Sequence, residues 1–376
     1  MKILFTCNEF PPYPNGGFGT FIKEISVELT KQNHQVYVYG VYPISKRKVI
    51  MIDGVTFIAD PKRSSNGYLN RINEIYVFGK EVNKLVKKYN IDIIDTEDSR
   101  GWFLFINNNK LFVRLHSSNI YFKKNRGRFN TIIEQIAFRI KRPKIIAVSQ
   151  FILEQFNRKF NKDDKIKNTK VILNGIKIGE QKDNSLKRKK SIVFAGTIKP
   201  AKGIKYLIDA FVKSGIEKEY TLDLYGKDIN LQGISYIKQL LSRSEQIKKL
   251  VKLKIINYHG VKSKKEIMTK YAEATICVFP SEFESFGLVV IEAMSVGALV
   301  IYTNQGAAKE IVSDNKDAFL VPIKNSNALA KKIKFVINMD EVDKEKVRGN
   351  AIKKAQKFSI ENCVTKSLNY YLKQDD

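Results

Sequence analysis

Two glutamates, Glu284 and Glu292, have the spacing and the setting of a ligand-binding pair. Glu284 lies in the polar turn SEFES, directly after the apolar run ATICVFP, and Glu292 lies in the run FGLVVIEAMSVG, which is expected to form a helix that ends at Gly297. The two glutamates are eight residues apart. At about 3.6 residues per turn, this separation places both carboxylates on roughly the same side, with Glu292 about two turns inside the helix. The unpaired amides at the start of such a helix suit a pyrophosphate, and Gly287 lets the backbone approach it closely. One carboxylate then suits a ribose diol and the other suits sugar hydroxyls.

The residues around the pair decide against the plainer interpretation, in which both glutamates are solvated. The string ESFGLVVIEAM, followed by GALVIYTNQGAAKEIV, resembles the retaining glycosyltransferase family 4 of the GT-B fold, also called glycosyl transferases group 1. The resemblance extends over nearly the whole chain and is more specific in the second half. It implies that Glu292 binds the ribose of a nucleotide and that Glu284 approaches the donor sugar. It also implies that the backbone between them holds phosphate and sugar, at Ser285, Phe286, Gly287 and Leu288.

The loop AGTIKPAKG provides a second part of the expected donor site. Lys202 follows a strand-like run and precedes a helix, where a lysine can neutralise a leaving phosphate. The resemblance identifies it with the lysine of the family's G-R-x-x-x-x-K-G loop, which begins here at Gly196. Thr197 stands where the family has arginine, so phosphate binding is weaker unless the neighbouring Lys199 compensates. A lone lysine in a lysine-rich chain is usually solvated. Gly203 and the following helix are what favour a phosphate-binding role for Lys202.

The segment PPYPNGGFGTFI, between the first strand and the first helix, resembles the first loop of the family. In that loop a glycine pair approaches the donor phosphate, and the matching residues here are Gly16 and Gly17. As a dinucleotide-binding fingerprint the segment is weak, because a third glycine in register is missing.

His116 ends the apolar run KLFVRLH, at the carboxyl end of an expected strand. A histidine at a strand end is more often structural than catalytic, but the resemblance implies that His116 lies close to the reacting sugar. The other two histidines, His34 and His259, fit structural roles. Asn174 and Gly175 match the family's N-G turn without the aspartate that usually follows it, so they are equally explained as a simple turn.

Strands alternating with helices position these residues. Strand-like runs include KILFTC, HQVYVYG, VTFIAD, DIIDTE, KLFVRLH and KIIAVS in the first half, and SIVFAG, TLDLYG, KIINYHG, ATICVFP and ALVIYT in the second. This alternation predicts an α/β protein with parallel sheets, here two doubly wound Rossmann-like domains of the GT-B type facing across a ligand-binding cleft. The predicted divisions are an acceptor-side domain 1–178, a linker 179–190, a nucleotide-sugar domain 191–355, and a C-terminal helix 356–376 that packs back on the first domain. The tail from about residue 342 is expected to be helical throughout.

The composition limits partners and location. The 376-residue chain has 66 Lys and Arg against 38 Asp and Glu, a formal charge of +28, which favours anionic partners unless the charge is simply a dispersed, solvated surface. Three cysteines without a pairing pattern fit a reducing cytoplasm. No apolar run reaches the roughly 20 residues needed to span a bilayer, and MKILFTCNEF is expected to be a first strand, not a secretory signal.

A basic segment, residues 121–144, is the candidate for membrane contact. Ile132, Ile136 and Ile140 recur in it at helical spacing, which is typical either of a helix lying on an anionic membrane or of one buried in the domain core. We expect the isoleucines to be buried. The basic loop Lys123–Arg128 is then the contact with an anionic membrane or acceptor.

The sequence therefore predicts a retaining, metal-independent glycosyltransferase with His116, Glu284 and Lys202 as catalytic residues. The donor is expected to be a nucleotide-diphospho-sugar, a UDP-sugar in particular, with no further cofactor. The acceptor is expected to be a glycan or a lipid-linked glycan in bacterial cell-surface glycan synthesis, with the enzyme cytoplasmic or peripheral on the inner membrane face. The main alternative is a non-catalytic GT-B protein that binds a polyanion or stabilises a partner transferase. An epimerase or a phosphorylase on the same fold fits less well, because the string from Glu284 to Glu292 points away from both. A nucleic-acid-binding protein also fits less well, because the basic residues are spread along the chain and no aromatic–basic nucleic-acid motif is present.

Overall fold

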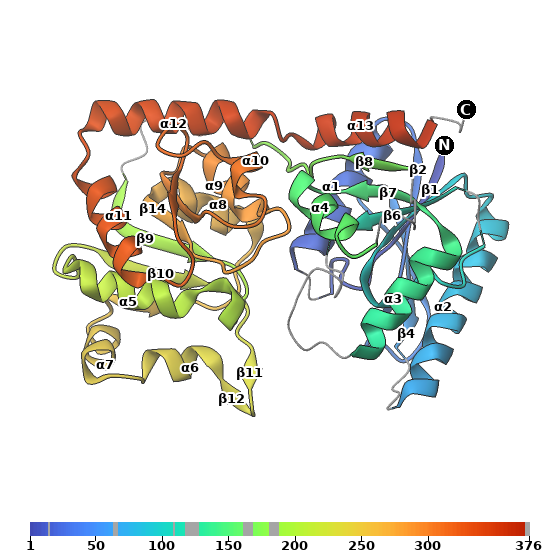
Figure 1. Ribbon diagram of the computed structural model, residues 1–376, viewed down its shortest axis with the longest axis horizontal. Helices are drawn as coiled ribbons and strands as arrows, with labels where there is room; N and C mark the ends of the chain where they lie inside the picture. Colours follow the sequence, from blue (N-terminus) through green and yellow to red (C-terminus); the bar gives the residue numbers. More distant parts are fainter. Residues whose placement is uncertain are drawn as a thin grey trace. The chain divides into compact units, whose positions relative to one another are not determined.

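The computed structural model divides the chain into two compact units (Figure 1). The first unit is Met1–Lys177 together with Ile360–Asp376, and the second is Ile178–Ser359. The structure describes residues 1–13, 16–62, 67–107, 110–116, 128–160, 168–179 and 188–372. Most of the predicted linker, residues 180–187, and most of the predicted basic loop, residues 123–127, lie outside the described residues.

The first unit is built on an eight-stranded sheet in the order β3-β4-β2-β1-β5-β6-β7-β8. Every neighbouring pair is parallel except β3 and β4, so β3 is an antiparallel edge strand that the alternating pattern did not predict. The order reverses between β1 and β5, and the loops that follow these two strands therefore meet at a switch point. The strands are β1 (Lys2–Thr6), β2 (Gln35–Tyr42), β3 (Lys48–Ile52), β4 (Val55–Pro61), β5 (Ile93–Glu97), β6 (Leu111–Leu115), β7 (Lys144–Ala147) and β8 (Thr169–Val171).

The C-terminal helix of the chain belongs to this first unit. Arg114 on β6 is fully buried and its Nη2 lies 2.6 Å from Asp95 on β5. Tyr371 donates to the same carboxylate at 2.5 Å, and Ser367 lies 3.4 Å from Arg114. A buried charge is stable only when it is paired and hydrogen-bonded, so this network fixes the last helix against the sheet. The helices are α1 (Gly17–Lys31), α2 (Tyr68–Tyr89), η1 (Ser99–Gly101), α3 (Arg128–Lys141), α4 (Gln150–Asn157) and α13 (Ile360–Leu372).

The prediction that Ile132, Ile136 and Ile140 pack into the core is wrong. Their exposed fractions are 51%, 39% and 65%. The neighbouring face of α3 is buried instead, and it includes Phe138, whose ring packs 4.9 Å from that of Phe103. The larger aromatic side chain buries more apolar area than the isoleucines do, so the helix turns that face inward.

The second unit contains a six-stranded sheet in the order β13-β10-β9-β14-β15-β16, and every neighbouring pair is parallel. The order reverses between β9 and β14, so the loops after these strands form the switch point of this unit. The strands are β9 (Lys189–Ala195), β10 (Thr221–Tyr225), β13 (Ile256–Tyr258), β14 (Ala274–Phe279), β15 (Val300–Thr303) and β16 (Phe319–Val321), with a small hairpin of β11 (Asn230–Leu231) and β12 (Ile234–Ser235).

Helices cover both faces of this sheet (Figure 1). They are η2 (Pro200–Lys202), α5 (Ile204–Ser214), α6 (Tyr236–Leu241), α7 (Glu245–Lys252), α8 (Lys264–Glu273), α9 (Leu288–Ser295), α10 (Ala308–Ile311), α11 (Ser326–Asn338) and α12 (Glu341–Gln356). The expectation of one continuous helix at the end of the chain is wrong, because α12 stops at Gln356 and α13 starts at Ile360. Phe358 lies in the break and packs against Phe286, with ring centroids 5.9 Å apart.

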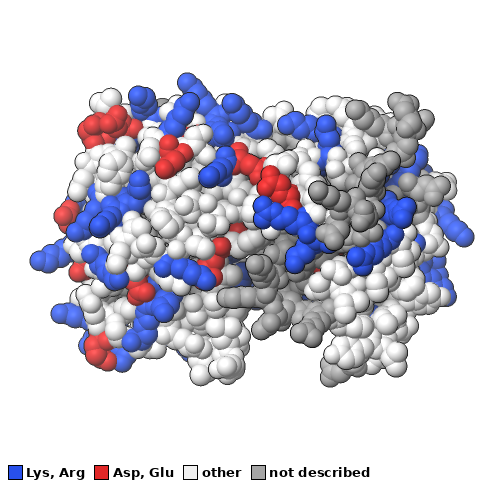
Figure 2. Space-filling model, viewed as in Figure 1, with Lys and Arg blue, Asp and Glu red and all other residues white. Residues whose placement is uncertain are grey.

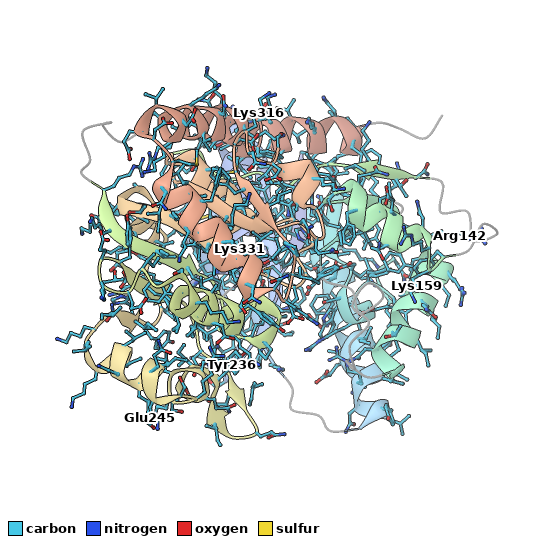
Figure 3. The ribbon with its side chains drawn as sticks, turned by 60° about the vertical axis from the view of Figure 1, so that its left-hand side comes forward. Arg142, Lys159, Tyr236, Glu245, Lys316 and Lys331 are labelled. Carbon is cyan, nitrogen blue, oxygen red and sulfur yellow. The ribbon has the colours of Figure 1, made fainter. Side chains whose placement is uncertain are left out.

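The basic charge is dispersed over the described surface. On the face drawn in Figure 2, Lys and Arg side chains are scattered over elements of both units. Figure 3 labels four basic residues on separate segments, Arg142 after α3 and Lys159 after α4 in the first unit, and Lys316 before β16 and Lys331 on α11 in the second, and all four are exposed. Among the described residues, no helix has the length and apolar character to cross a membrane.

Candidate active site

Three loops of the second unit meet at the carboxyl ends of β9, β14 and β15. The amide of Glu282, after β14, donates to the carbonyl of Ala201, after β9, at 2.9 Å. Thr303, at the end of β15, donates its hydroxyl to the carbonyl of Ser281 at 2.6 Å. These bonds hold the turn 280–287 against the loop that carries Lys202, which is the arrangement expected at the ligand-binding end of a parallel sheet.

Lys202 and Glu284 form a close ion pair within this group of loops. The ammonium of Lys202 donates to Oε1 of Glu284, which also accepts a hydrogen bond of 2.8 Å from the hydroxyl of Ser281. The two charged side chains are 20% and 15% exposed, so both are partly withdrawn from water yet still reachable from it. The structure therefore brings together two predicted residues from loops 82 positions apart in sequence.

The loop of Lys202 is held tightly against the turn by Gly203. This glycine has φ of +68°, and a Cβ on it would lie 2.0 Å from the carbonyl oxygen of Pro280. Only glycine fits such an approach without moving the backbone. Gly196, Thr197 and Lys199 lie in the same loop, and all three are half-buried.

Helix α9 begins later than the sequence suggested. Gly287 is its N-cap residue with φ of +99°, and Leu288 is its first residue. Glu292 is therefore just past the first turn, not two turns inside, because the left-handed backbone at Gly287 prevents an earlier start. Phe286 is 2% exposed and packs on Phe358, so only its backbone is available to a donor. Ser285 lies half-buried in the turn.

Glu292 is paired with a residue that the sequence did not single out. Its Oε1 lies 3.0 Å from the ammonium of Lys264, the first residue of α8, and the Glu292 side chain is only 12% exposed. Lys264 stands in the run KSKKE, where nothing distinguishes it from its neighbours. Its position becomes visible only when α8 and α9 pack together.

His116 is buried at the end of β6 in the first unit. Its ring lies edge-on to Phe18, with centroids 4.7 Å apart, and its Nδ1 is 3.5 Å from the side-chain nitrogen of Asn174. Burial, together with the nearby Arg114, holds the pKa of His116 well below its ordinary value, so the imidazole is neutral. Among the described residues, no partner is found for His116 Nε2 or for the side-chain oxygen of Asn174.

Gly16 and Gly17 stand at the start of α1, where Gly16 is the N-cap residue and Gly17 the first residue. The amides of Gly16 and Gly19 donate to the two carboxylate oxygens of Glu9, at 3.2 and 3.0 Å. A carboxylate is stabilised by such helix-start amides, so Glu9 occupies the place in which an anion would otherwise bind. Sequence reasoning missed Glu9, although an acidic residue between the first strand and a glycine-rich loop is a visible signal.

Two family models match the chain, one in each half. The model for glycosyl transferases group 1 matches residues 177–358. The model for glycosyltransferase family 4 matches residues 15–180. The chain belongs to glycosyltransferase family 4.

Full-length and partial relatives agree with this assignment. An uncharacterized glycosyltransferase of Methanocaldococcus jannaschii is 26% identical to this transferase, over 97% of the present chain and 96% of the relative. The O-antigen chain mannosyltransferase B of Escherichia coli is 29% identical over 48% of the present chain and 45% of its own. HepE of Anabaena, solved in complex with UDP and glucose, has a TM-score of 0.74 at 20% identity, covering 98% of this chain and 99% of that one. The predicted GT-B fold, with two parallel-sheet α/β domains, is confirmed.

The transferase also has a pocket of about 1010 Å³ within its first unit, at the β1–β5 switch point. We name it the β1–β5 pocket. Its lining includes Glu9, Glu97 and Arg71, none of which the sequence indicated. Burial, followed by the nearby Glu9, raises the pKa of Glu97 to about 7, although its bond from Ser99 acts in the opposite direction. A carboxyl group that titrates near neutrality in a pocket is a candidate functional group.

Proposed function

We propose that this protein is a retaining glycosyltransferase that moves a sugar from a UDP-sugar to a hydroxyl of a glycan or lipid-linked acceptor in bacterial cell-surface glycan synthesis. The observation that carries the proposal is the Lys202–Glu284 pair beside the start of α9. Two relatives support the choice of substrates: one is a mannosyltransferase of the O-antigen chain, and the other was solved with UDP and glucose.

The second unit has the groups needed to bind and activate the donor. The ammonium of Lys202 and the amides at the start of α9 stabilise the diphosphate as the bond between it and the anomeric carbon breaks. The acceptor oxygen then bonds to the anomeric carbon on the same face, and its proton passes to the departing phosphate oxygen. Because the lysine and the amides provide the positive charge, we propose that the reaction needs no metal ion.

Glu292 would bind the ribose of the donor. In the structure its carboxylate is balanced by Lys264 at 3.0 Å. Two hydroxyls of a ribose can donate to the same carboxylate, so the diol either joins Lys264 or replaces it. An ionised carboxylate held by a neighbouring lysine is well prepared to accept these hydrogen bonds.

His116 would donate one hydrogen bond to the transferred sugar. The neutral ring carries one proton, and the side-chain nitrogen of Asn174, 3.5 Å from Nδ1, favours the tautomer with the proton on Nε2. A buried N–H without a protein partner costs free energy until a ligand accepts its bond. Gly16 and Gly17 are proposed to contact the donor phosphate only after Glu9 moves away from the start of α1, where its carboxylate now accepts from the amides of Gly16 and Gly19.

A donor screen tests the proposed activity. The full chain is incubated with a panel of UDP-, GDP- and other nucleotide-sugars, and nucleotide release is measured for the wild type and for Glu284→Gln. We expect release from one or a few donors, with a loss of at least about tenfold in the variant, since the variant removes the charge that holds Lys202. A Glu245→Gln variant, changed at an exposed glutamate of α7, is the matched control. Release from no donor would instead favour a non-catalytic GT-B protein. That alternative is supported by Thr197, which stands where the family has arginine.

We further propose that the first unit docks on an anionic membrane through exposed apolar residues of α2 and α3. The two helices meet at their N-terminal ends, where the rings of Tyr68 and Phe129 are 4.6 Å apart. We define the apolar face of α2 and α3 by its exposed large residues: Tyr68, Leu69, Ile72, Tyr76, Ile132, Ile136 and Ile140. Basic residues at the end of α3, Lys141 and Arg142, flank this face, and apolar side chains bordered by cations fit an anionic lipid surface.

Vesicle sedimentation tests the docking proposal. The full chain is mixed with vesicles of phosphatidylglycerol and, separately, of phosphatidylcholine. We expect binding to the anionic vesicles only, weakened at least about tenfold in the double variant Ile132→Ser, Ile140→Ser, because each change removes apolar area from the bilayer contact. Val342→Ser, changed at a residue of α12 that is 81% exposed, is the control. Equal binding of the double variant and the wild type would exclude this face.

A further inference from the structure

The β1–β5 pocket contains five carboxylates, and all of them are engaged. Asp60 and Glu81 are both paired with Arg47, at 2.7 and 3.2 Å. Glu74 accepts from Arg71 at 2.7 Å. Glu9 accepts from the amides at the start of α1, and Glu97 accepts from the side chains of Asn8, at 3.2 Å, and Ser99, at 2.9 Å.

The cations of the same pocket are not fully engaged. Arg71 donates to Glu74 through Nη1, but its Nη2 is buried and has no partner among the described residues. Arg100 and Lys62 also line the pocket, and both are exposed. For their side chains the described part of the structure shows neither a hydrogen bond nor an ion pair. A ligand in the pocket could therefore accept from the Nη2 of Arg71 and from the side chains of Arg100 and Lys62.

The backbone holds Arg100 in place at the pocket wall. Arg100 has a left-handed conformation with φ of +58°, and its amide donates to the fully buried Glu134 of α3 at 2.6 Å. Proximity of Arg100 lowers the pKa of Arg71, an effect second to that of burial. Two guanidinium groups brought together at a cost in mutual repulsion are stabilised by an anion placed between them.

We propose that the β1–β5 pocket binds a phosphate or diphosphate ester of the acceptor, held by Arg71, Arg100 and Lys62. This inference rests on the proposed function, since it names the class of acceptor. Arginine matches phosphate oxygens with paired N–H donors, and the open Nη2 of Arg71 supplies a donor that is already desolvated. The carboxylates of Glu9 and Glu97 would then accept hydrogen bonds from the sugar hydroxyls of the same molecule.

The apolar face of α2 and α3 indicates how such an ester could be presented. Arg71 lies on α2 among exposed apolar residues of that face, Leu69 and Ile72, and Asn130 on α3 lines the pocket next to Phe129. A phosphate attached to a lipid would leave its chain near these side chains. A phosphate on a water-soluble sugar would use the same cations without them.

Trp102 provides a direct reporter for this site. It is the one tryptophan of the chain, it lines the pocket, and the guanidinium of Arg71 lies 4.8 Å from its ring centre. The full chain is titrated with inorganic pyrophosphate, with farnesyl diphosphate and with farnesol while tryptophan emission is recorded. We expect a saturable change with both diphosphates and none with farnesol.

Variants that leave the Arg71–Trp102 contact intact test which residues bind. Arg100→Gln and Lys62→Gln should each weaken diphosphate binding about tenfold or more, since a hydrogen bond to a charged group is lost. Lys87→Gln loses the same charge on an exposed residue of α2, about 24 Å along the helix from Arg71, and should bind as the wild type does. No saturable change with either diphosphate, or unaltered binding by both Arg100→Gln and Lys62→Gln, would overturn the proposal.

Comparison of the titrations with farnesyl diphosphate and with pyrophosphate distinguishes a lipid-linked ester from a soluble one. Tighter binding of farnesyl diphosphate than of pyrophosphate identifies a lipid-linked ester, and equal binding identifies a soluble one. The titration needs no donor, and nucleotide release by the wild type needs no ligand in the β1–β5 pocket. A failure of this inference is therefore distinguishable from a failure of the proposed transferase activity.

Discussion

The charged side chains at the switch points of the two units are paired differently. In the second unit each predicted carboxylate has its own lysine: Glu284 is paired with Lys202, and Glu292 with Lys264. In the first unit the carboxylates of the β1–β5 pocket are satisfied by amides and by other side chains, while Nη2 of Arg71 has no partner among the described residues and Arg100 is exposed at the pocket wall. In the second unit a donor diphosphate can thus replace the carboxylate of Glu284 as the partner of Lys202. The first unit has a buried guanidinium nitrogen, Nη2 of Arg71, that a ligand could satisfy.

Lys202→Ala is expected to have the largest effect on this comparison. The variant removes the cation that we place on the leaving diphosphate and leaves Glu284 with Ser281 as its one hydrogen-bond donor among the described residues. Loss of one group that stabilises developing charge costs about 10²- to 10³-fold in kcat. The measurement is steady-state transfer with the donor found in the screen. Lys205→Ala, changed at an exposed lysine of α5, should leave kcat unaltered.

Glu292→Ala is expected to affect binding of the donor more than its reaction. Removal of the ribose acceptor should raise the donor KM about 10- to 100-fold, because one or two charge-assisted hydrogen bonds are lost, and leave kcat within a few-fold. Lys264→Ala removes the ion pair with Glu292 but leaves the carboxylate in place, so it should give a smaller increase in the donor KM. Unchanged donor kinetics in Glu292→Ala would remove the ribose assignment, and Glu245→Ala is the control for an exposed glutamate.

The difference between the units also explains what the sequence could predict. In the second unit the turn, the helix and both glutamates lie within 280–295, so a local pattern predicted them together, although α9 begins later than that pattern suggested. Lys264 was missed because it reaches Glu292 only through the packing of α8 on α9. In the first unit the pocket residues come from the loop after β1 and from elements that include β2, β4, β5, α2, η1 and α3, with no local pattern to join them. No rule of spacing connects Glu9, Arg71 and Glu97.

Periodicity had a similar limit in α3. Ile132, Ile136 and Ile140 do lie on one face, as their spacing predicts, but spacing does not say whether that face is the buried one. The adjacent face is buried because Phe138 packs there against the rings of Phe103 and Phe156, which come from other segments of the chain. Most central strands were predictable because each depends on a short apolar run, and the parallel sheets followed from the alternation of such runs with helices, whereas the edge strand β3 was not predicted.

Asn174→Ala is expected to have a moderate effect, confined to the first unit. The side-chain nitrogen 3.5 Å from His116 Nδ1 is proposed to hold the ring tautomer that donates from Nε2. Without it both tautomers and more ring orientations are populated, so kcat should fall about tenfold with the donor KM unchanged. A purely structural role would instead lower the melting temperature without this division between kcat and KM. Asn168→Ala is a control at an asparagine of the same unit, before β8.

Glu97→Gln is expected to have the smallest effect on transfer and a definite effect on stability. Burial and Glu9 raise the pKa of Glu97 from 4.5 to about 7, so the folded chain retains a proton between these pH values that the unfolded chain releases. The stabilisation this provides is complete below about pH 4.5 and is lost as pH rises through about 7. The glutamine stays neutral, so the variant should gain up to roughly 3 kcal/mol over the wild type between pH 5 and pH 8, measured by urea unfolding.

The pH dependence of the difference in unfolding free energy between Glu97→Gln and the wild type tests whether carboxylates in the two units are equally well stabilised when charged. An equal difference between Glu97→Gln and the wild type at pH 5 and pH 8 would mean that the carboxylate is as well satisfied when charged as those paired with lysine in the second unit. Glu245→Gln should show little pH dependence, because that carboxylate is 88% exposed. A gain that grows with pH would instead show that the first unit bears an unfavourable charge at neutral pH. Hydroxyl donors of a bound acceptor would then relieve that cost, so the pocket that binds the acceptor would also be the part of the unit that the acceptor stabilises most.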